Sequence, residues 1–346
     1  MKKTLLLFFF YAISLFSYAQ NEGWAICNSG ANLYFKIVGS GSPVLVVSDV
    51  GNSSAYLKEL ISKISETNRV IYYDARATGK SRLPVIHDST LNFNKAVEDI
   101  EALRNVLRIP KWSVLAHGFG ANIAGAYAVR YGQALQQLVL VNPDLITKLH
   151  TRSNDAYFDT FEEYDFTTLL PTVAISRRFD VLQQRLRNHI PTKDSVADSL
   201  KRWRMIVEFQ APTYVYDTLH EPFAVDYLNE RLKNAAVKQR VRENSKWQSG
   251  VSIGEIRNYR GPMMVVFSRK RRNLTSLTKG WRDHVPHCQV VLIDKAHHFP
   301  WLDNPAFFYA QIQPFLSKPI IIPTQYASKK KVSRSVGRGY QRGKRA

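Results

Sequence analysis

Cysteine is scarce in this chain of 346 residues, which contains two, Cys27 and Cys288. They lie far apart in the sequence, and neither belongs to a C-x-x-C pair or to a histidine cluster with the spacing of metal ligands. The sequence therefore predicts no metal site and no cofactor. It leaves two states of the thiols open, a single disulfide or two free buried cysteines, because a disulfide requires Cα atoms within about 7 Å.

Apolar runs long enough to span a membrane are also absent. The longest, Leu5–Phe16, is shorter than the roughly 20 residues that a spanning helix requires. It follows Lys2 and Lys3 and precedes Ser17-Tyr18-Ala19, which is the pattern of a signal peptide. We therefore expect residues 1–19 to be cleaved off and the mature chain to be periplasmic or extracellular, with no transmembrane span.

Acidic residues are few, because 28 Asp and Glu stand against 48 Lys and Arg, for a formal net charge of +20. Residues 329–346 hold eight basic residues and no acidic one, and their Gly and Ser content predicts a disordered tail. Such a tail suits contact with anionic lipid or polysaccharide, or serves as a solubilising end. Nucleic acid is not an expected partner, because no recognition motif accompanies the basic run.

The chain does contain a regular alternation of apolar strands and amphipathic helices. Continuous apolar runs such as Val44–Val47 predict strands buried on both faces of a sheet. Strand and helix in strict alternation predict an α/β fold with a mostly parallel sheet flanked by helices. The predicted strands are Leu33–Val38, Val44–Val47, Val70–Tyr73, Trp112–Leu115, Leu138–Val141, Met263–Phe267 and Gln289–Ile293. The predicted helices are Ala55–Ser65, Asn94–Leu107, Phe119–Tyr131, Val181–Ile190, Ser195–Phe209, Val225–Gln239, Leu274–Trp281 and Pro305–Phe315.

The alternation stops over residues 147–260, where the patterns are helical. Because strands resume at residue 263, this stretch is predicted to be a helical cap inserted between two strands of one sheet. The core then consists of residues 20–146 and 261–328.

The most informative segment is Leu115–Ala121, which reads Leu-Ala-His-Gly-Phe-Gly-Ala between a predicted strand and a predicted helix. A sharp strand-to-helix turn with the pattern G-x-S-x-G, a nucleophile elbow, holds a reactive serine above a sheet. Here Ala116 and Gly120 supply the small flanking residues, but Gly118 stands at the nucleophile position. The turn forces its central residue to a positive φ, which glycine adopts without strain. The sequence thus predicts the turn without its reactive oxygen.

Four further segments support a resemblance: Tyr34–Val47, Tyr73–Ser81, Asp99–Arg104 and Ala296–Trp301. Taken in order with the elbow, they resemble the α/β-hydrolase superfamily, most closely the branch of proline iminopeptidases and related esterases with a helical cap. The likeness covers about residues 30–317. It implies the α/β-hydrolase fold.

The resemblance also implies roles for individual residues. His298 falls on the family's catalytic histidine, which acts as the base. Gly118 falls on the nucleophile, and Arg271 falls where the family has the acid that orients the histidine. A cation there would oppose the imidazolium that the mechanism generates. Asp144, which follows the predicted strand Leu138–Val141, is an alternative acid.

The oxyanion hole of the family would use the backbone N–H groups of Val50 and Phe119. The expected His-Gly before it reads Ser48-Asp49, and a carboxylate there would repel a developing oxyanion if it pointed inward. Asp49, Arg269 and Arg272 are candidate ligand-binding residues. The arginines favour an anionic group at the rim of a pocket, or belong to a solvated loop.

These departures favour a secreted α/β-hydrolase-fold protein that lacks conventional serine-hydrolase activity and acts by binding a small molecule or partner. Two alternatives stay open. The first is an active aminopeptidase-like or esterase-like hydrolase in which His298 acts as base on water. The second is a scaffold that presents its basic tail to envelope polyanions.

Overall fold

The computed structural model describes residues 21–28, 30–143, 195–234, 253–270 and 274–317, together with residues 180, 181, 184, 185, 188 and 237. Several predictions fall outside the described residues: the signal peptide 1–19, the tail 329–346, Asp144, Arg271 and Arg272.

The described residues form one sheet of eight strands, in the order β1-β2-β4-β3-β5-β6-β7-β8. Strands β1, β2 and β4 pair antiparallel, and all other neighbours pair parallel, which confirms the predicted mostly parallel sheet. The strands are β1 (Glu22–Ile26), β2 (Asn32–Val38), β3 (Pro43–Val47), β4 (Arg69–Tyr73), β5 (Trp112–His117), β6 (Leu135–Val141), β7 (Met263–Ser268) and β8 (Gln289–Ile293).

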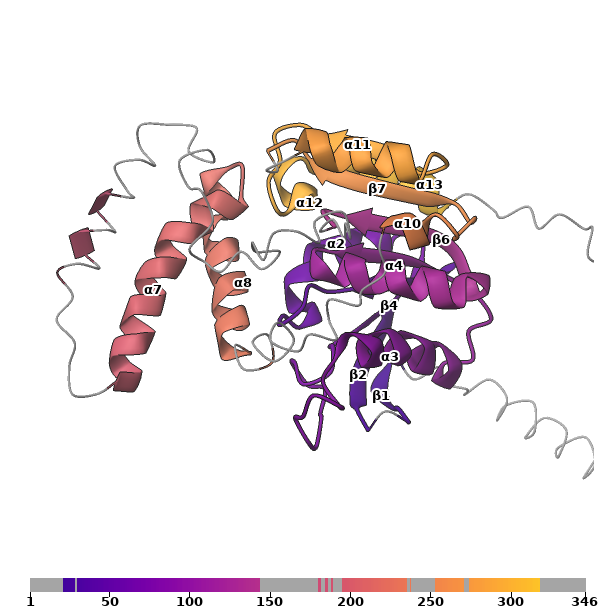
Figure 1. Cartoon of the computed structure of the whole chain (residues 1–346), viewed down its shortest axis with the longest axis horizontal. Helices are drawn as coiled ribbons and strands as arrows, with labels where there is room; N and C mark the ends of the chain where they lie inside the picture. Colours follow the sequence, from indigo (N-terminus) through magenta and orange to yellow (C-terminus); the bar gives the residue numbers. More distant parts are fainter. Residues whose placement is uncertain are drawn as a thin grey trace, which may run out of the picture.

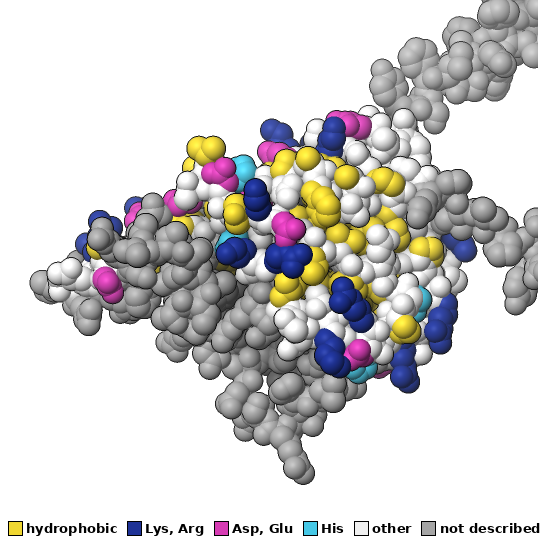
Figure 2. Space-filling view, turned by 90° about the horizontal axis from the view of Figure 1, so that it is seen from above, with side chains coloured by type: hydrophobic (Ala, Val, Ile, Leu, Met, Phe, Trp, Pro, Cys, Tyr) yellow, Lys and Arg dark blue, Asp and Glu magenta, His cyan; other side chains and the backbone are white. Residues whose placement is uncertain are grey.

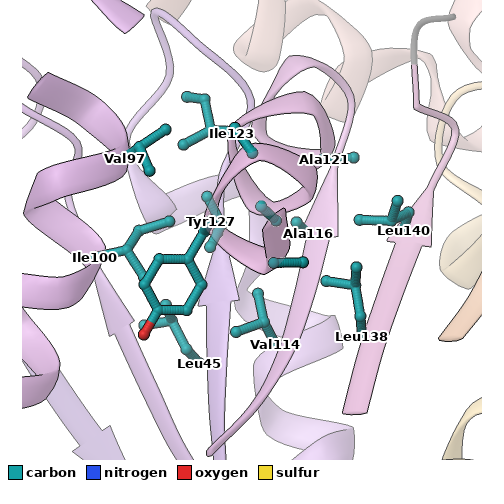
Figure 3. Close-up of a cluster of buried hydrophobic side chains, with 14 of the residues drawn as sticks. Leu45, Val97, Ile100, Val114, Ala116, Ala121, Ile123, Tyr127, Leu138 and Leu140 are labelled. Carbon is teal, nitrogen blue, oxygen red and sulfur yellow. The ribbon is translucent and has the colours of Figure 1, made fainter. Parts of the chain in front are cut away.

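Helices cover both faces of this sheet (Figure 1). Apolar side chains of α3 (Phe93–Val106), α4 (Phe119–Tyr131) and α11 (Leu274–His284) pack on one face. On the opposite face pack α2 (Lys58–Ile64) and α13 (Pro305–Leu316). Figure 3 shows Val97 and Ile100 of α3 and Ile123 and Tyr127 of α4 over the strands. Among the described helices, none is long and apolar enough to cross a membrane.

The described helices between β6 and β7 include α7 (Ser195–Tyr214), η4 (Thr218–His220) and α8 (Glu221–Lys233). Leu138 of β6 pairs directly with Met263 of β7, so the chain leaves the sheet and returns to the adjacent strand. Figure 1 shows α8 between α7 and the core. The stretch ends with α10 (Ile253–Ile256), whose Ile256 packs on Gly125 of the core helix α4.

Strand β1 and the end of helix α7 are among the features that differ from the sequence prediction. Strand β1 was not predicted, because its inward positions, Gly23 and Ala25, carry little of the apolar pattern that marks a strand. Helix α7 continues five residues past the predicted end at Phe209 and runs through Pro212 to Tyr214. The predicted helix 181–190 falls mostly outside the described residues.

The two cysteines are not joined. Cys27 is buried, Cys288 is half-buried, and neither is part of a disulfide. Burial raises the pKa of each thiol to about 12, so both are protonated at neutral pH. Of the two states that the sequence left open, the structure has the free thiols.

Gly120 lets α4 approach the end of β3 closely. A Cβ atom at this position would lie 2.2 Å from the backbone oxygen of Ser48, so the backbone would have to move. We expect Gly120→Ala to lower the free energy of unfolding by about 1–3 kcal/mol, measured by urea unfolding. Gly125→Ala is the matched control, because its Cβ would meet the mobile end of Ile256 at 3.0 Å and helix propensity offsets the contact. Equal effects of the two changes would contradict the prediction.

Candidate active site

Gly118 lies at a sharp turn between β5 and α4. Its φ of 59° and ψ of −131° belong to a region that side-chain-bearing residues rarely adopt. The Gly118 N–H donates to the carbonyl of Val141 at 3.0 Å, which holds the turn against β6. The geometry is that of a nucleophile elbow, but glycine supplies no side chain to attack a substrate.

The carboxylate of Asp49 occupies the space next to Gly118. A Cβ atom on Gly118 would lie 2.8 Å from Cγ of Asp49 and 3.0 and 3.1 Å from its two oxygens. Asp49 is buried, in the loop that follows β3. Its carboxylate therefore stands where the side chain of an elbow nucleophile would begin.

Oδ1 of Asp49 accepts two backbone hydrogen bonds. The donors are the N–H of Val50 at 2.8 Å and the N–H of Phe119 at 2.9 Å. These are the two groups that the sequence predicted to form an oxyanion hole. The carboxylate of Asp49 thus occupies the position in which these N–H groups would stabilise the negative oxygen that forms during acyl transfer.

Oδ2 of Asp49 faces helix α8. It accepts a hydrogen bond from the hydroxyl of Tyr227 and lies 4.0 Å from a guanidinium nitrogen of Arg231. Burial alone would raise the pKa of Asp49, but the charge of Arg231 and the hydrogen bonds to the carboxylate hold the pKa below its ordinary value of 3.8. Asp49 is therefore ionised at neutral pH.

His298 joins this cluster through Tyr227. Its Nε2 atom lies 3.1 Å from the Tyr227 hydroxyl, whose hydrogen goes to Asp49. Nε2 must then donate to the hydroxyl oxygen, and the chain of donors runs from His298 through Tyr227 to Asp49. Burial raises the pKa of the Tyr227 hydroxyl well above its usual range, which keeps it a neutral donor.

His117 and Tyr56 close the hydrogen bonds into a ring. Nε2 of His117 lies 2.9 Å from the carbonyl oxygen of His298, which can only accept, so a neutral His117 carries its proton on Nε2. Nδ1 lies 3.0 Å from the hydroxyl of Tyr56, which also accepts the N–H of Asp49 at 2.7 Å. The ring connects the loop after β3, the end of β5, the loop after β8 and helix α8.

Among the described residues, the serine hydroxyls of the loop after β3 and of strand β5 form hydrogen bonds away from the elbow. Ser53 accepts from Ala55 at the start of η1 (Ser54–Leu57), and the Ser54 hydroxyl donates to Asp74 at 2.8 Å. The Ser113 hydroxyl donates to Gln137 at 3.0 Å within the sheet. Each hydroxyl makes a structural bond.

Arg269, a predicted ligand-binding residue, lies on the surface. Its side chain is 56% exposed and forms an ion pair with Asp294, whose carboxylate balances the charge of the guanidinium. On the face drawn in Figure 2, Lys and Arg side chains are spread out, and several have an acidic neighbour. For Arg269, this arrangement favours a solvated position over one that recognises an anion. Within the described residues, no three His, Cys, Asp or Glu side chains are grouped to hold a metal ion.

The residues of helix α8 that belong to the site were not predicted from the sequence. Tyr227 and Arg231 are four residues apart on α8, which places them on one face of the helix. Nothing in that spacing distinguishes them from an ordinary aromatic and basic pair. Their role depends on where α8 lies against the core.

The family of the chain follows from comparison with known proteins. A model of the alpha/beta hydrolase family matches residues 44–311. The chain belongs to that family. Similar proteins include a cis-3-alkyl-4-alkyloxetan-2-one decarboxylase of Shewanella oneidensis, 27% identical over 118 residues, and a proline iminopeptidase of Heyndrickxia coagulans, 29% identical over 112 residues. The alignments cover 34% and 32% of this chain but 37% and 38% of those relatives, little more than a third of their length.

Solved structures of α/β hydrolases share the fold over a longer stretch. An esterase from Exiguobacterium antarcticum superimposes with a TM-score of 0.62 at 14% identity, covering 85% of this chain and 99% of the esterase. A proline iminopeptidase-related protein from Thermus thermophilus gives a TM-score of 0.57 at 20% identity, covering 85% and 96%. These structures confirm the predicted α/β-hydrolase fold, and the family match together with the similarity to the Heyndrickxia coagulans proline iminopeptidase confirms the predicted resemblance.

Proposed function

We propose that this α/β hydrolase lacks serine-hydrolase chemistry and acts by binding a small molecule. The observation that carries the proposal is the pair formed by Gly118 and Asp49. Acyl transfer requires a nucleophile and vacant donors for the oxyanion. Gly118 at the elbow has no side chain, and the N–H groups of Val50 and Phe119 already bind the carboxylate of Asp49. Export of the chain, predicted from residues 1–19, is part of the same proposal.

A hydrolase that uses His298 as base on water is less well supported. The base must offer a lone pair to the water that it deprotonates. Nε2 of His298, the atom directed toward the site, donates to Tyr227 in the described arrangement. The two relatives are named as a decarboxylase and a peptidase, and these different activities point to no common substrate. The basic-tail alternative concerns residues outside the described ones.

Reaction with a fluorophosphonate probe tests the proposal. We expect no labelling of the wild-type protein and no turnover of aminoacyl or acyl esters above that of free imidazole, because Gly118 has no oxygen or sulfur to react. A conventional serine hydrolase serves as the positive control. Brisk labelling would refute the proposal. Turnover that resists the probe but disappears in His298→Ala would make the water-activating histidine the mechanism.

A further inference from the structure

The groups around Asp49 form a complete set of donors for a carboxylate. One oxygen receives two backbone N–H groups, and the other receives the Tyr227 hydroxyl beside the Arg231 guanidinium. Hydrogen bonds to ionised acceptors and a nearby guanidinium are the usual means by which proteins bind carboxylates. The structure thus holds a carboxylate in a buried site, and that carboxylate belongs to the chain itself.

Other contacts hold the cap side of this donor set in place. The Asn52 amide donates to the carbonyl of Tyr227 at 2.9 Å, and the Asn234 amide donates to the carbonyl of Gly51 at 3.0 Å. The Ser53 N–H donates to Glu230 at 2.9 Å. These three bonds join α8 and its C-terminal end to the loop after β3 without using the Asp49 side chain. The donors should therefore keep their positions when that side chain is removed.

We infer that this donor set is a carboxylate-binding subsite that the chain fills with its own Asp49, and that ligands of the site carry a carboxylate that takes its place. The inference rests on the proposed binding function and names the ligand class. The Asp49 side chain competes at high effective concentration, so an added carboxylate binds the wild-type protein weakly. Removing the side chain leaves the donors vacant for a small carboxylate.

Acetate binding to Asp49→Ala tests the inference directly. We expect a saturable rise in melting temperature and a shift of the acetate NMR signal with a Kd of about 1–10 mM, as a four-atom ligand allows. The wild-type protein should bind at least about tenfold more weakly. Acetamide, which has the same shape without the charge, should not bind. Asp283→Ala, which removes an exposed carboxylate paired with Lys279, is the matched control and should behave as wild type.

Asp49→Asn separates a vacant subsite from a mere change of charge. The asparagine still fills the space, so acetate should bind it as weakly as it binds the wild-type protein. Equal binding by Asp49→Asn and Asp49→Ala would overturn the inference. In the Asp49→Ala background, Arg231→Gln and Tyr227→Phe should each weaken acetate binding at least about fivefold. Binding that survives both changes would also overturn it.

Asp49→Gly provides a second vacant variant. If either variant is unfolded in chloride, acetate should restore its cooperative unfolding transition, because a ligand of the native state stabilises it. Absence of rescue would count against the inference. These outcomes are independent of the fluorophosphonate result. Labelling of the wild-type protein would refute the proposed function, whereas the acetate titration tests the carboxylate-binding subsite.

Discussion

We expect Gly118→Ser to lower the free energy of unfolding by about 2–6 kcal/mol and to create no serine-hydrolase activity. A non-glycine residue at this φ and ψ costs about 1–3 kcal/mol of backbone strain. The new Cβ also lies 2.8 Å from Cγ of Asp49, an overlap that adds about 1–3 kcal/mol. From the sequence only the backbone strain could be expected, because the direction of the Asp49 side chain could not be foreseen. Urea unfolding and fluorophosphonate labelling measure the two effects.

Two further variants separate the strain from the collision. Gly30 has a φ of 86° and nothing within 4 Å of its added Cβ, so Gly30→Ser reports the cost of positive φ alone. Asp49→Gly in the Gly118→Ser background removes the collision and should recover stability with a coupling of about 0.5–3 kcal/mol. It also vacates the predicted oxyanion hole, so any labelling should appear only in this double variant. Full reactivity of Gly118→Ser alone would show that Asp49 is not an obstacle.

The fold and the turn at Gly118 follow from local patterns, whereas the chemistry of the site does not. Apolar runs such as Val44–Val47 carry their own strand signal, and a glycine between a strand and a helix marks a strained turn. Whether Asp49 points into the site depends on Tyr227 and Arg231, which follow it by about 180 residues and belong to another helix. Side-chain direction of that kind is set by tertiary packing, so the sequence could name Asp49 but not its orientation.

The loop after β4 supports the segment that carries Asp49. The Asp74 carboxylate accepts the N–H of Ser54 at 3.0 Å and the N–H of Lys80 at 2.8 Å, which joins the two loops. Arg76 anchors the same loop through a bidentate ion pair with Asp99 of α3, at 2.7 and 2.5 Å. Both side chains are almost fully buried, with 3% and 2% exposed. The pair thus links α3 to the scaffold of the site.

Asp99→Ala should therefore be among the most destabilising single changes outside the site. Removing one partner of a buried ion pair leaves an uncompensated charge and costs about 3–5 kcal/mol, measured by urea unfolding. The exposed pair between Lys279 and Asp283 is the control, and Asp283→Ala should change stability by less than about 1 kcal/mol. Arg76→Met combined with Asp99→Leu should recover much of the loss, because two apolar side chains leave no charge buried. A similar loss in the single and the double variant would show that Arg76 acts through its bonds to the carbonyls of Thr90 and Lys95 rather than through its charge.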